Sequence, residues 1–167
     1  MNGNNIVMDR CLFSADWTAN SNETTTIATA TGSPFESNCV SFAKVDGAAT
    51  TAYGLVYKLV PSLAVINAAI SDKLYWSVYA SALTNITAAA IRLGTDASNY
   101  CEWRFAVAGM TAASWSACSA TVGNAYVTGT GCDFLDITYI GTGILFDNEA
   151  RTLAGIKISR IELSPGL

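Results

Sequence analysis

The sequence predicts an all-β domain in which eight or nine short antiparallel strands form two packed sheets or a closed barrel, with at most one short helix. The apolar segments mostly alternate with period two, which places successive side chains on opposite faces of a strand. Clusters of Gly, Ser, Thr, Asn and Asp separate these segments at short intervals, as turns between strands do. A chain of 167 residues with this pattern is expected to form one domain.

The clearest element is an antiparallel hairpin over residues 86–115, with a polar turn at 94–99. One face of its first arm carries Thr87, Ala89, Ile91 and Leu93. The second arm alternates between a face with Cys101, Trp103, Phe105 and Val107 and a face with Tyr100, Glu102, Arg104 and Ala106. This alternation predicts one buried face and one wetter face.

Residues 1–10 are polar and unpatterned, and we expect an N-terminal arm there that is ordered only against another chain, with the domain spanning 11–167. Before the hairpin, strands are expected over 39–45 and 53–60, a short first strand or an entry segment over 11–17, and a loop or irregular edge strand over 20–34. On 53–60 the residues of one face are Tyr53, Leu55, Tyr57 and Leu59.

Residues 61–71 are the one candidate helix, because Pro61 suits a first helical turn and Leu63, Ile66 and Ile70 recur at helical spacing. A turn or loop is the alternative. The next segment, 73–83, is a strong strand with Leu74, Trp76 and Val78 on its apolar face, so Trp76 is expected to be buried. The hairpin is followed by strands over 114–122, 134–140 and 155–163, a loop over 123–131 and a polar connection over 147–151.

Composition excludes several classes of function. Only 13% of the residues are charged, against about 25% in average soluble domains, and the net charge is −4. A nucleic-acid-binding protein needs clustered Lys and Arg, so no nucleic-acid partner is expected. No apolar run reaches the ~18 residues that cross a bilayer, and the N-terminus does not read as a secretory signal. A surface rich in Ser, Thr and Ala suits permanent contacts with other chains.

Five cysteines, Cys11, Cys39, Cys101, Cys118 and Cys132, lie far apart without CxxC spacing, and the chain has no histidine. A zinc site is therefore not expected. Buried reduced thiols are one interpretation and disulfides formed after release from a cell are the other, and the sequence does not decide between them.

No catalytic residues are predicted. Asp133 with Asp136, or Asp147 with Glu149, would be the candidate acid pairs of a glycosidase, but such an enzyme holds its carboxyl groups at a set separation that sequence spacing does not show. The absence of histidine excludes Ser-His and Cys-His nucleophiles. No cofactor or metal is predicted either. Oxygens of Asp96, Ser98 and Asn99 could bind calcium, but a turn capped by its own side chains explains them equally well.

Four aromatic side chains are candidates for a sugar-stacking platform, because aromatic faces stack on the apolar faces of sugars: Tyr75, Tyr79, Tyr100 and Trp103. Tyr75 and Tyr79 are the preferred pair, since they oppose the apolar face of strand 73–83. The alternative interpretation places these aromatics in the core or in a subunit interface.

Several segments in this order, CLFSADW, SNCVSFAK, KLYWSVY, IRLGTDASNYCEW, FLDITYI and GIKISRIEL, carry a resemblance that covers residues 11–163. The chain resembles the jelly-roll sandwich modules, lectin- and carbohydrate-binding-module-like, that recur in structural proteins of tailed bacteriophages. The resemblance implies an antiparallel two-sheet jelly-roll sandwich. Related modules often end in I-x-I-D-x-I-x-L with the acid near bound calcium. Here the segment reads IKISRIEL without that acid, so the resemblance does not extend to the metal site.

The resemblance, together with the short chain and the absence of an export signal, leads us to expect a virion structural protein. The preferred role is a capsid decoration or cement protein, assembled in the host cytoplasm as a symmetric homotrimer on the major capsid protein. The alternative is a glycan- or receptor-binding module of a tail or head fibre, whose partner is a cell-surface glycan. A glycoside-active enzyme is the third class and is not expected, because the paired acids are not evident.

Overall fold

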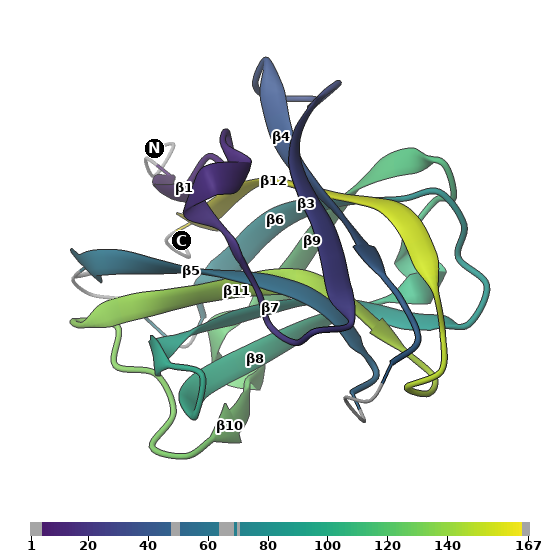
Figure 1. The fold of residues 1–167 in the computed structure, drawn as a ribbon. Coiled ribbons are helices and arrows are strands. Elements are labelled where there is room, and N and C mark those ends of the chain that lie inside the picture. The colour runs from purple at the N-terminus through teal and green to yellow at the C-terminus, as the bar shows by residue number, and fades with distance from the viewer. Residues whose placement is uncertain (1–4, 48–50, 64–68, 70, 165–167) are drawn as a thin grey trace.

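Two six-stranded antiparallel sheets pack against each other in the computed structural model, which describes residues 5–47, 51–63, 69 and 71–164 (Figure 1). The described residues form twelve strands, and their helical segments are three short 3-10 turns at Ser14–Asp16, Val107–Gly109 and Val122–Asn124. The predicted two-sheet, all-β jelly-roll sandwich is therefore confirmed, with more strands than the eight or nine expected. Among these residues no helix is long and apolar enough to span a bilayer.

The first sheet, called the β6 sheet, has the strand order β3 (Thr24–Thr31), β4 (Asn38–Lys44), β12 (Leu153–Ser164), β6 (Lys73–Ala80) and β9 (Ser114–Thr121). Its sixth strand, β1 (Ile6–Asp9), pairs with β12. The second sheet, called the β7 sheet, has the order β10 (Tyr126–Thr128), β8 (Asn99–Ala106), β7 (Ile86–Asp96), β11 (Ile137–Phe146), β5 (Tyr53–Leu63) and β2 (Thr18–Ala19).

The hydrophobic core fills the space between the sheets. Trp76 from β6 is 2% exposed and Trp103 from β8 is 1% exposed, so each sheet contributes one fully buried indole. The burial of Trp76 confirms the face predicted for this strand. Ile91 from β7 and Ile158 from β12 are also buried in this cluster. Period-two alternation on the inner faces thus builds the core.

Two expectations about the chain's organisation differ from the structure. Residues Ile6–Asp9 were expected to lie in an arm ordered only by another chain, but they pair with β12 of their own sheet, and Met8 is buried. The helix expected over 61–71 is not formed at its start, because Pro61 and Leu63 extend β5. Pro61 is tolerated there because the pairing of β5 with β11 is irregular at that end and β2 pairs with β5 elsewhere. Residues 64–68 and 70 lie outside the described residues.

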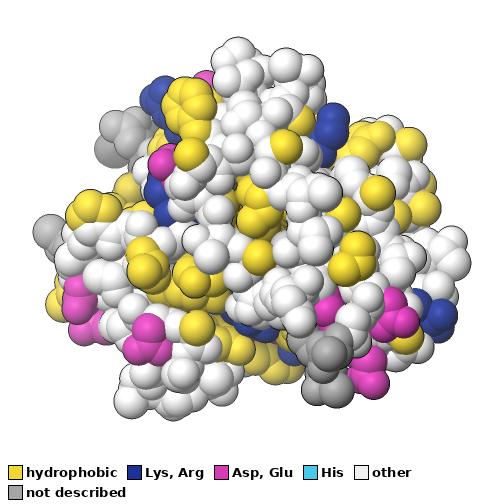
Figure 2. Space-filling view, in the orientation of Figure 1, with side chains coloured by type: hydrophobic (Ala, Val, Ile, Leu, Met, Phe, Trp, Pro, Cys, Tyr) yellow, Lys and Arg dark blue, Asp and Glu magenta, His cyan; other side chains and the backbone are white. Residues whose placement is uncertain are grey.

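Three smaller differences concern the ends of elements. The segment expected as a short first strand or an entry segment over 11–17 contains a 3-10 turn, and the loop expected over 123–131 contains β10. The strand expected over 134–140 begins only at Ile137 and continues to Phe146. The surface agrees with the low charge content: Figure 2 shows large white and yellow areas of uncharged surface, with charged side chains in a few small groups.

Candidate functional site

The outer face of the β7 sheet gathers tyrosines from four strands. The inner face is identified by Gly54 of β5, where an added Cβ would lie 3.3 Å from Ile156 of the opposite sheet. Because side chains alternate along a strand, Tyr53 points away from the core. Cross-strand register places five of the seven tyrosines of the chain on this outer face: Tyr53, Tyr57, Tyr100, Tyr126 and Tyr139. We call this set the tyrosine face.

The rings of the tyrosine face contact one another across strands. Tyr57 and Tyr139 are stacked with ring centroids 5.4 Å apart, and Tyr100 lies 6.2 Å from Tyr139 on the other side. Tyr139 is fully buried beneath its neighbours, whereas Tyr126 at the sheet edge is 56% exposed. The face therefore has a buried ring at its centre and partly or largely exposed rings around it, with Tyr126 at the β10 edge the most exposed.

A charged cluster lies among these rings. Arg92 Nε donates to Glu102 Oε2 at 2.7 Å, and Arg104 Nε donates to Glu102 Oε1 at 2.6 Å. The Tyr53 hydroxyl donates to Glu102 Oε1 at 2.7 Å and accepts from Arg104 Nη2 at 2.9 Å. Four side chains from three strands, β5, β7 and β8, are thereby joined in one network.

The arginines also contact the faces of three tyrosine rings. The Arg92 guanidinium carbon lies 4.3 Å from the ring centroid of Tyr53 and 4.6 Å from that of Tyr100. Arg104 lies 4.3 Å from the ring centroid of Tyr126. Cation–π contacts of this kind are worth about 0.5–2 kcal/mol each. The orientations of three rings are thus set before any ligand arrives.

Two tyrosine hydroxyls of the face have a raised pKa, which favours their neutral form. Burial, together with the hydrogen bond to the Glu102 carboxylate, raises the pKa of Tyr53. Burial likewise raises the pKa of Tyr139, although the Arg92 charge opposes that shift. Neutral phenol groups both donate and accept hydrogen bonds, and the Tyr53 hydroxyl uses both capacities within the cluster, while the Tyr139 hydroxyl is buried.

Small residues occupy the middle of the face. An added Cβ at Gly141 would lie 3.1 Å from the Tyr139 hydroxyl and 3.3 Å from Leu55, so glycine leaves room for that hydroxyl. The Tyr139 hydroxyl is buried and has no hydrogen-bond partner among the described residues. Flat rings flanking small residues, with polar groups at their edges, form a surface suited to a flat ligand that carries both apolar and hydroxyl faces.

The structure does not bring the four aromatics predicted from sequence together. Tyr75 and Tyr79 point outward from the β6 sheet, Tyr100 belongs to the tyrosine face on the opposite side, and Trp103 is in the core. Tyr79 packs against Trp115 with ring centroids 6.0 Å apart and against the Lys157 ammonium at 5.1 Å.

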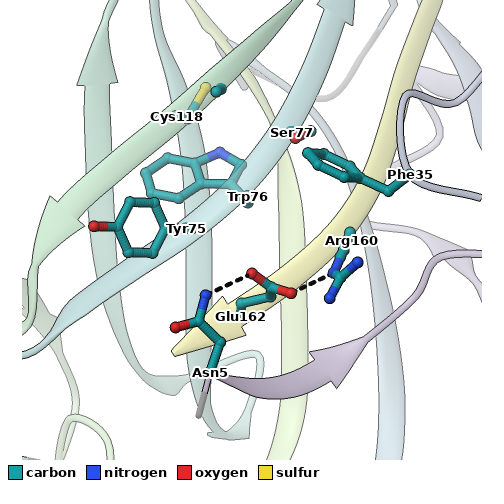
Figure 3. A pocket seen from close by; sticks show the side chains of 9 residues that line it. Asn5, Phe35, Tyr75, Trp76, Ser77, Cys118, Arg160 and Glu162 are labelled. Carbon is teal, nitrogen blue, oxygen red and sulfur yellow. Dashed lines mark hydrogen bonds and ion pairs between the residues drawn. The ribbon is translucent and has the colours of Figure 1, made fainter. Parts of the chain in front are cut away.

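Tyr75 lines a small pocket of about 150 Å³ on the outer side of the β6 sheet, together with Phe35 (Figure 3). The polar groups of this pocket are paired with each other. Arg160 forms an ion pair with Glu162, and Asn5 Nδ2 donates to the other oxygen of that carboxylate at 3.1 Å. The pocket is mainly apolar, and its polar side chains satisfy one another.

The candidate acid pairs lie in exposed connections. Asp133 and Asp136 are in the turn before β11, not on a strand, and the Asp133 carboxylate caps the backbone N–H of Leu135. Asp147 forms an ion pair with Arg151, which lowers the pKa of Asp147. Neither pair faces the tyrosine face or the pocket beside Tyr75.

The hairpin turn considered for calcium is capped by its own groups. Asp96 Oδ1 accepts from the backbone N–H groups of Ser98 and Asn99, and Asn99 Nδ2 donates to both carboxylate oxygens. These contacts lower the pKa of Asp96. In the part of the chain described, no three His, Cys, Asp or Glu side chains gather as a metal site would require. All five cysteines are free thiols.

Sequence reasoning missed most of the tyrosine face. It placed Tyr53 with Tyr57, and Tyr100 with Glu102 and Arg104, on shared faces, and the latter face is the wetter one of its strand, with Arg104 and Ala106 exposed. It did not predict that Glu102 on that face is 3% exposed. Two arginines and a hydroxyl neutralise and solvate this carboxylate, which allows its burial. The available signal was local: Tyr100 shares one strand face with the charged residues Glu102 and Arg104. Tyr126 and Tyr139 carried no local signal, since only register brings them there.

Structural comparison finds the same fold in carbohydrate-binding proteins. One neighbour is the family 11 carbohydrate-binding module from Clostridium thermocellum in complex with a β-1,3-1,4-mixed-linked tetrasaccharide, with TM-score 0.64, 12% identity and coverage of 100% of this chain and 98% of that one. Another is the family 30 carbohydrate-binding module of a cellulosomal cellulase of Clostridium thermocellum, with TM-score 0.62, 8% identity and 96% coverage of both chains.

A third neighbour is arabinose-bound MgGH51 α-L-arabinofuranosidase, with TM-score 0.58 and 12% identity, where the match covers 98% of this chain and 27% of the enzyme. No protein-family model and no curated protein sequence matches the chain. At these identities the likeness establishes the fold, a carbohydrate-binding-module-like β-sandwich. None of these three neighbours is a bacteriophage protein, so the capsid-decoration role, the homotrimer and the virion location stay predictions.

Proposed function

We propose that the chain is a non-catalytic carbohydrate-binding module that binds a glycan chain along the tyrosine face of the β7 sheet. The observation that carries this proposal is the gathering of five tyrosines on one outer sheet face, held by the Arg92–Glu102–Arg104 cluster. This is the glycan-binding alternative among the functions expected from sequence. It takes precedence over capsid decoration because the structural neighbours include carbohydrate-binding modules.

The physical case is that of a preorganised stacking surface. A sugar ring has apolar C–H faces that pack on aromatic rings and a polar edge that bonds to hydroxyl and guanidinium groups. Rings that are already fixed lose little conformational freedom when a ligand binds, so less of the contact energy is spent on ordering. Tyr57, Tyr100 and Tyr126 are partly or largely exposed and offer the stacking area. The tetrasaccharide held by the family 11 module supports an oligosaccharide as the ligand class.

The proposal excludes glycoside cleavage at this face. Glycosidases use one carboxyl group as acid and a second as base or nucleophile, and one of the two must exchange protons. Glu102, at the centre of the face, accepts hydrogen bonds from Arg92, Arg104 and Tyr53. Both of its oxygens are occupied by these protein donors and the side chain is 3% exposed, so it is not placed to contact a glycosidic bond.

Affinity electrophoresis and calorimetry with a panel of soluble polysaccharides test the proposal. Tyr100→Ala should weaken binding about tenfold, which corresponds to about 1.4 kcal/mol. Tyr75→Ala is the matched control, because it removes an equally large exposed ring from the opposite sheet. Unfolding curves establish that both variants remain folded. Loss of binding only in Tyr75→Ala would move the site to the β6 sheet, where Tyr75 and Tyr79 were predicted. Failure of the whole panel to bind would refute the proposal.

Attachment of this module to a virus capsid is a separate proposal. It is supported by the low fraction of charged residues, 13%, and by the sequence resemblance. Uncharged surface costs little to bury, and edge strands such as β3 and β10 gain hydrogen bonds when a neighbouring chain covers them. A closed trimer would match the threefold positions of a capsid lattice. Light scattering and co-sedimentation with empty capsids test it. A monomer that does not sediment with capsids would count against this attachment and leave glycan binding unaffected.

A further inference from the structure

The charged cluster of the tyrosine face is unbalanced in sign. Arg92 and Arg104 share one carboxylate, that of Glu102, so the three side chains carry one net positive charge. The chain as a whole has a net charge of −4. The centre of the proposed binding face therefore carries a positive charge, although the protein as a whole is acidic.

Most of the acceptor capacity of the cluster is already used. Glu102 Oε2 accepts from Arg92, and Oε1 accepts from both Arg104 and the Tyr53 hydroxyl. A neutral sugar hydroxyl is bound best where a protein offers an acceptor for its proton as well as a donor to its oxygen. The carboxylate that would supply this acceptor is tied to protein donors and is 3% exposed.

Hydrogen-bond donors, in contrast, remain available on Arg104. A guanidinium carries five N–H groups. In the described part of the chain, Arg104 uses Nε for Glu102 and Nη2 for the Tyr53 hydroxyl, and its side chain is 35% exposed. It lies beside Tyr126, the most exposed ring of the face. The guanidinium covers one face of the Tyr126 ring, so a ligand at the exposed edge of that ring can reach the unused N–H groups and the positive charge.

We infer that the glycan bound by this face carries carboxylate groups, that is, uronic acid units, and that Arg104 contacts them. The inference rests on the proposed function and names its ligand class. A planar carboxylate accepts two parallel N–H bonds from a guanidinium, a geometry that a neutral hydroxyl does not match. Acidic side chains elsewhere repel such a ligand weakly, because charges beyond about 8 Å are screened at physiological salt.

The experiment compares each ligand with its own neutral form. Calorimetry is performed with oligogalacturonate and oligomannuronate, and with the same oligosaccharides after reduction of their carboxyl groups to alcohols. At about 50 mM salt, at least one uronate should bind about tenfold more tightly than its reduced form, and at about 500 mM salt this ratio should fall several-fold. Sulfated galactan is included to separate carboxylate recognition from attraction to any anion.

Two variants assign the effect to Arg104. Arg104→Gln should remove the preference for uronate over the reduced form. Arg104→Lys should retain only part of this preference, because lysine keeps the positive charge but lacks the paired N–H groups that bind a carboxylate through both oxygens. Lys73→Gln, an exposed position on the β6 sheet, makes the same change in net charge and should leave the preference intact.

The possible results separate the two proposals. Equal or tighter binding of the reduced oligosaccharides, with loss in Tyr100→Ala, would overturn the uronate inference and leave glycan binding on the tyrosine face standing. Tighter binding of sulfated galactan than of either uronate would also overturn it. Binding of none of these sugars, and of none in the wider panel, would refute both.

Discussion

Arg92 Nε lies 2.7 Å from Glu102 Oε2, and the two side chains are 7% and 3% exposed, although both belong to the outer face of their sheet. The rings of Tyr53 and Tyr100 flank the guanidinium and exclude water from the pair. Desolvating two charges is costly unless their remaining hydrogen-bonding capacity is satisfied. Arg104 and the Tyr53 hydroxyl meet that requirement for the carboxylate, so one network both stabilises the sheet face and orients its rings.

Glu102→Ala should therefore lower the free energy of unfolding by ~3–5 kcal/mol, because it leaves the Arg92 guanidinium buried without its counter-charge. Urea unfolding followed by tryptophan fluorescence measures the change. The control is Asp147→Ala, which breaks the exposed pair with Arg151 and should cost far less, because solvent screens exposed ion pairs. Equal, small losses in both variants would mean that Arg92 is hydrated and that the network does not hold the face together.

Trp76→Ala should cost ~3–5 kcal/mol, as large-to-small changes in a core do. The Trp76 indole is 2% exposed between the sheets, whereas its neighbour Tyr75 is 36% exposed on the outer side of the same strand. Tyr75→Ala should consequently cost much less in the same urea titration. A loss under about 1 kcal/mol for Trp76→Ala would contradict the burial of this face.

The contrast between Trp76 and Tyr100 shows what local sequence predicts. Alternation along one strand correctly separated the buried and exposed faces of β6, because Leu74, Trp76 and Val78 are all apolar. On β8 the same reasoning separated the two faces, and Arg104 and Ala106 of the wetter face are exposed, but it gave no sign that Glu102 on that face is buried against Arg92 of the neighbouring strand. Charges that pair between strands become buried, and that pairing depends on register, which a period-two pattern does not specify.

The site depends on register even more strongly. Tyr139 lies opposite Gly94, which lies opposite Tyr100, and the first of these pairings joins segments 45 residues apart in the chain (139 − 94 = 45). Tyr57 reaches the same face because it pairs with Gly141. Each tyrosine has a local pattern compatible with a strand, but the order of strands in the sheet decides whether they meet. The gathering of five rings was therefore beyond prediction from the sequence alone.

Stability should decline in mildly alkaline solution. Burial raises the pKa of the Cys118 thiol from 9.0 to about 12, and the side chain is fully buried. Between these values the unfolded chain releases the thiol proton while the folded chain retains it, so rising pH favours unfolding. The contribution of Cys118 is complete below about pH 9, and about 1.4 kcal/mol of it should be lost between pH 8 and pH 10.

The measurement is urea unfolding at a series of pH values under reducing conditions, with Cys118→Ala as the comparison. The variant should start less stable, because it leaves a small cavity, but its stability should fall less steeply between about pH 8 and pH 10. Parallel pH profiles for the two proteins would show that the Cys118 thiol titrates normally in the folded state. The other thiols whose pKa is raised by burial, Cys11, Cys39 and Cys132, remain in both proteins and so do not affect the difference.

Gly94→Ala should both destabilise the sandwich and weaken glycan binding. An added Cβ would lie 2.1 Å from the backbone oxygen of Asn99 and 2.6 Å from Cα of Tyr100, and backbone atoms cannot rotate away as a flexible side chain can. The β7–β8 ladder must then separate locally, at a cost of ~1–3 kcal/mol or more, and carry Tyr100 away from Tyr139.

Gly155→Ala is the control: its Cβ meets no atom within 4 Å, and its cost of about 1 kcal/mol comes only from a backbone φ of +70°. Unfolding and calorimetry should show loss of both stability and affinity at Gly94 but of stability alone at Gly155. Unchanged affinity in a folded Gly94→Ala protein would mean that the spacing between Tyr100 and Tyr139 does not matter to the ligand.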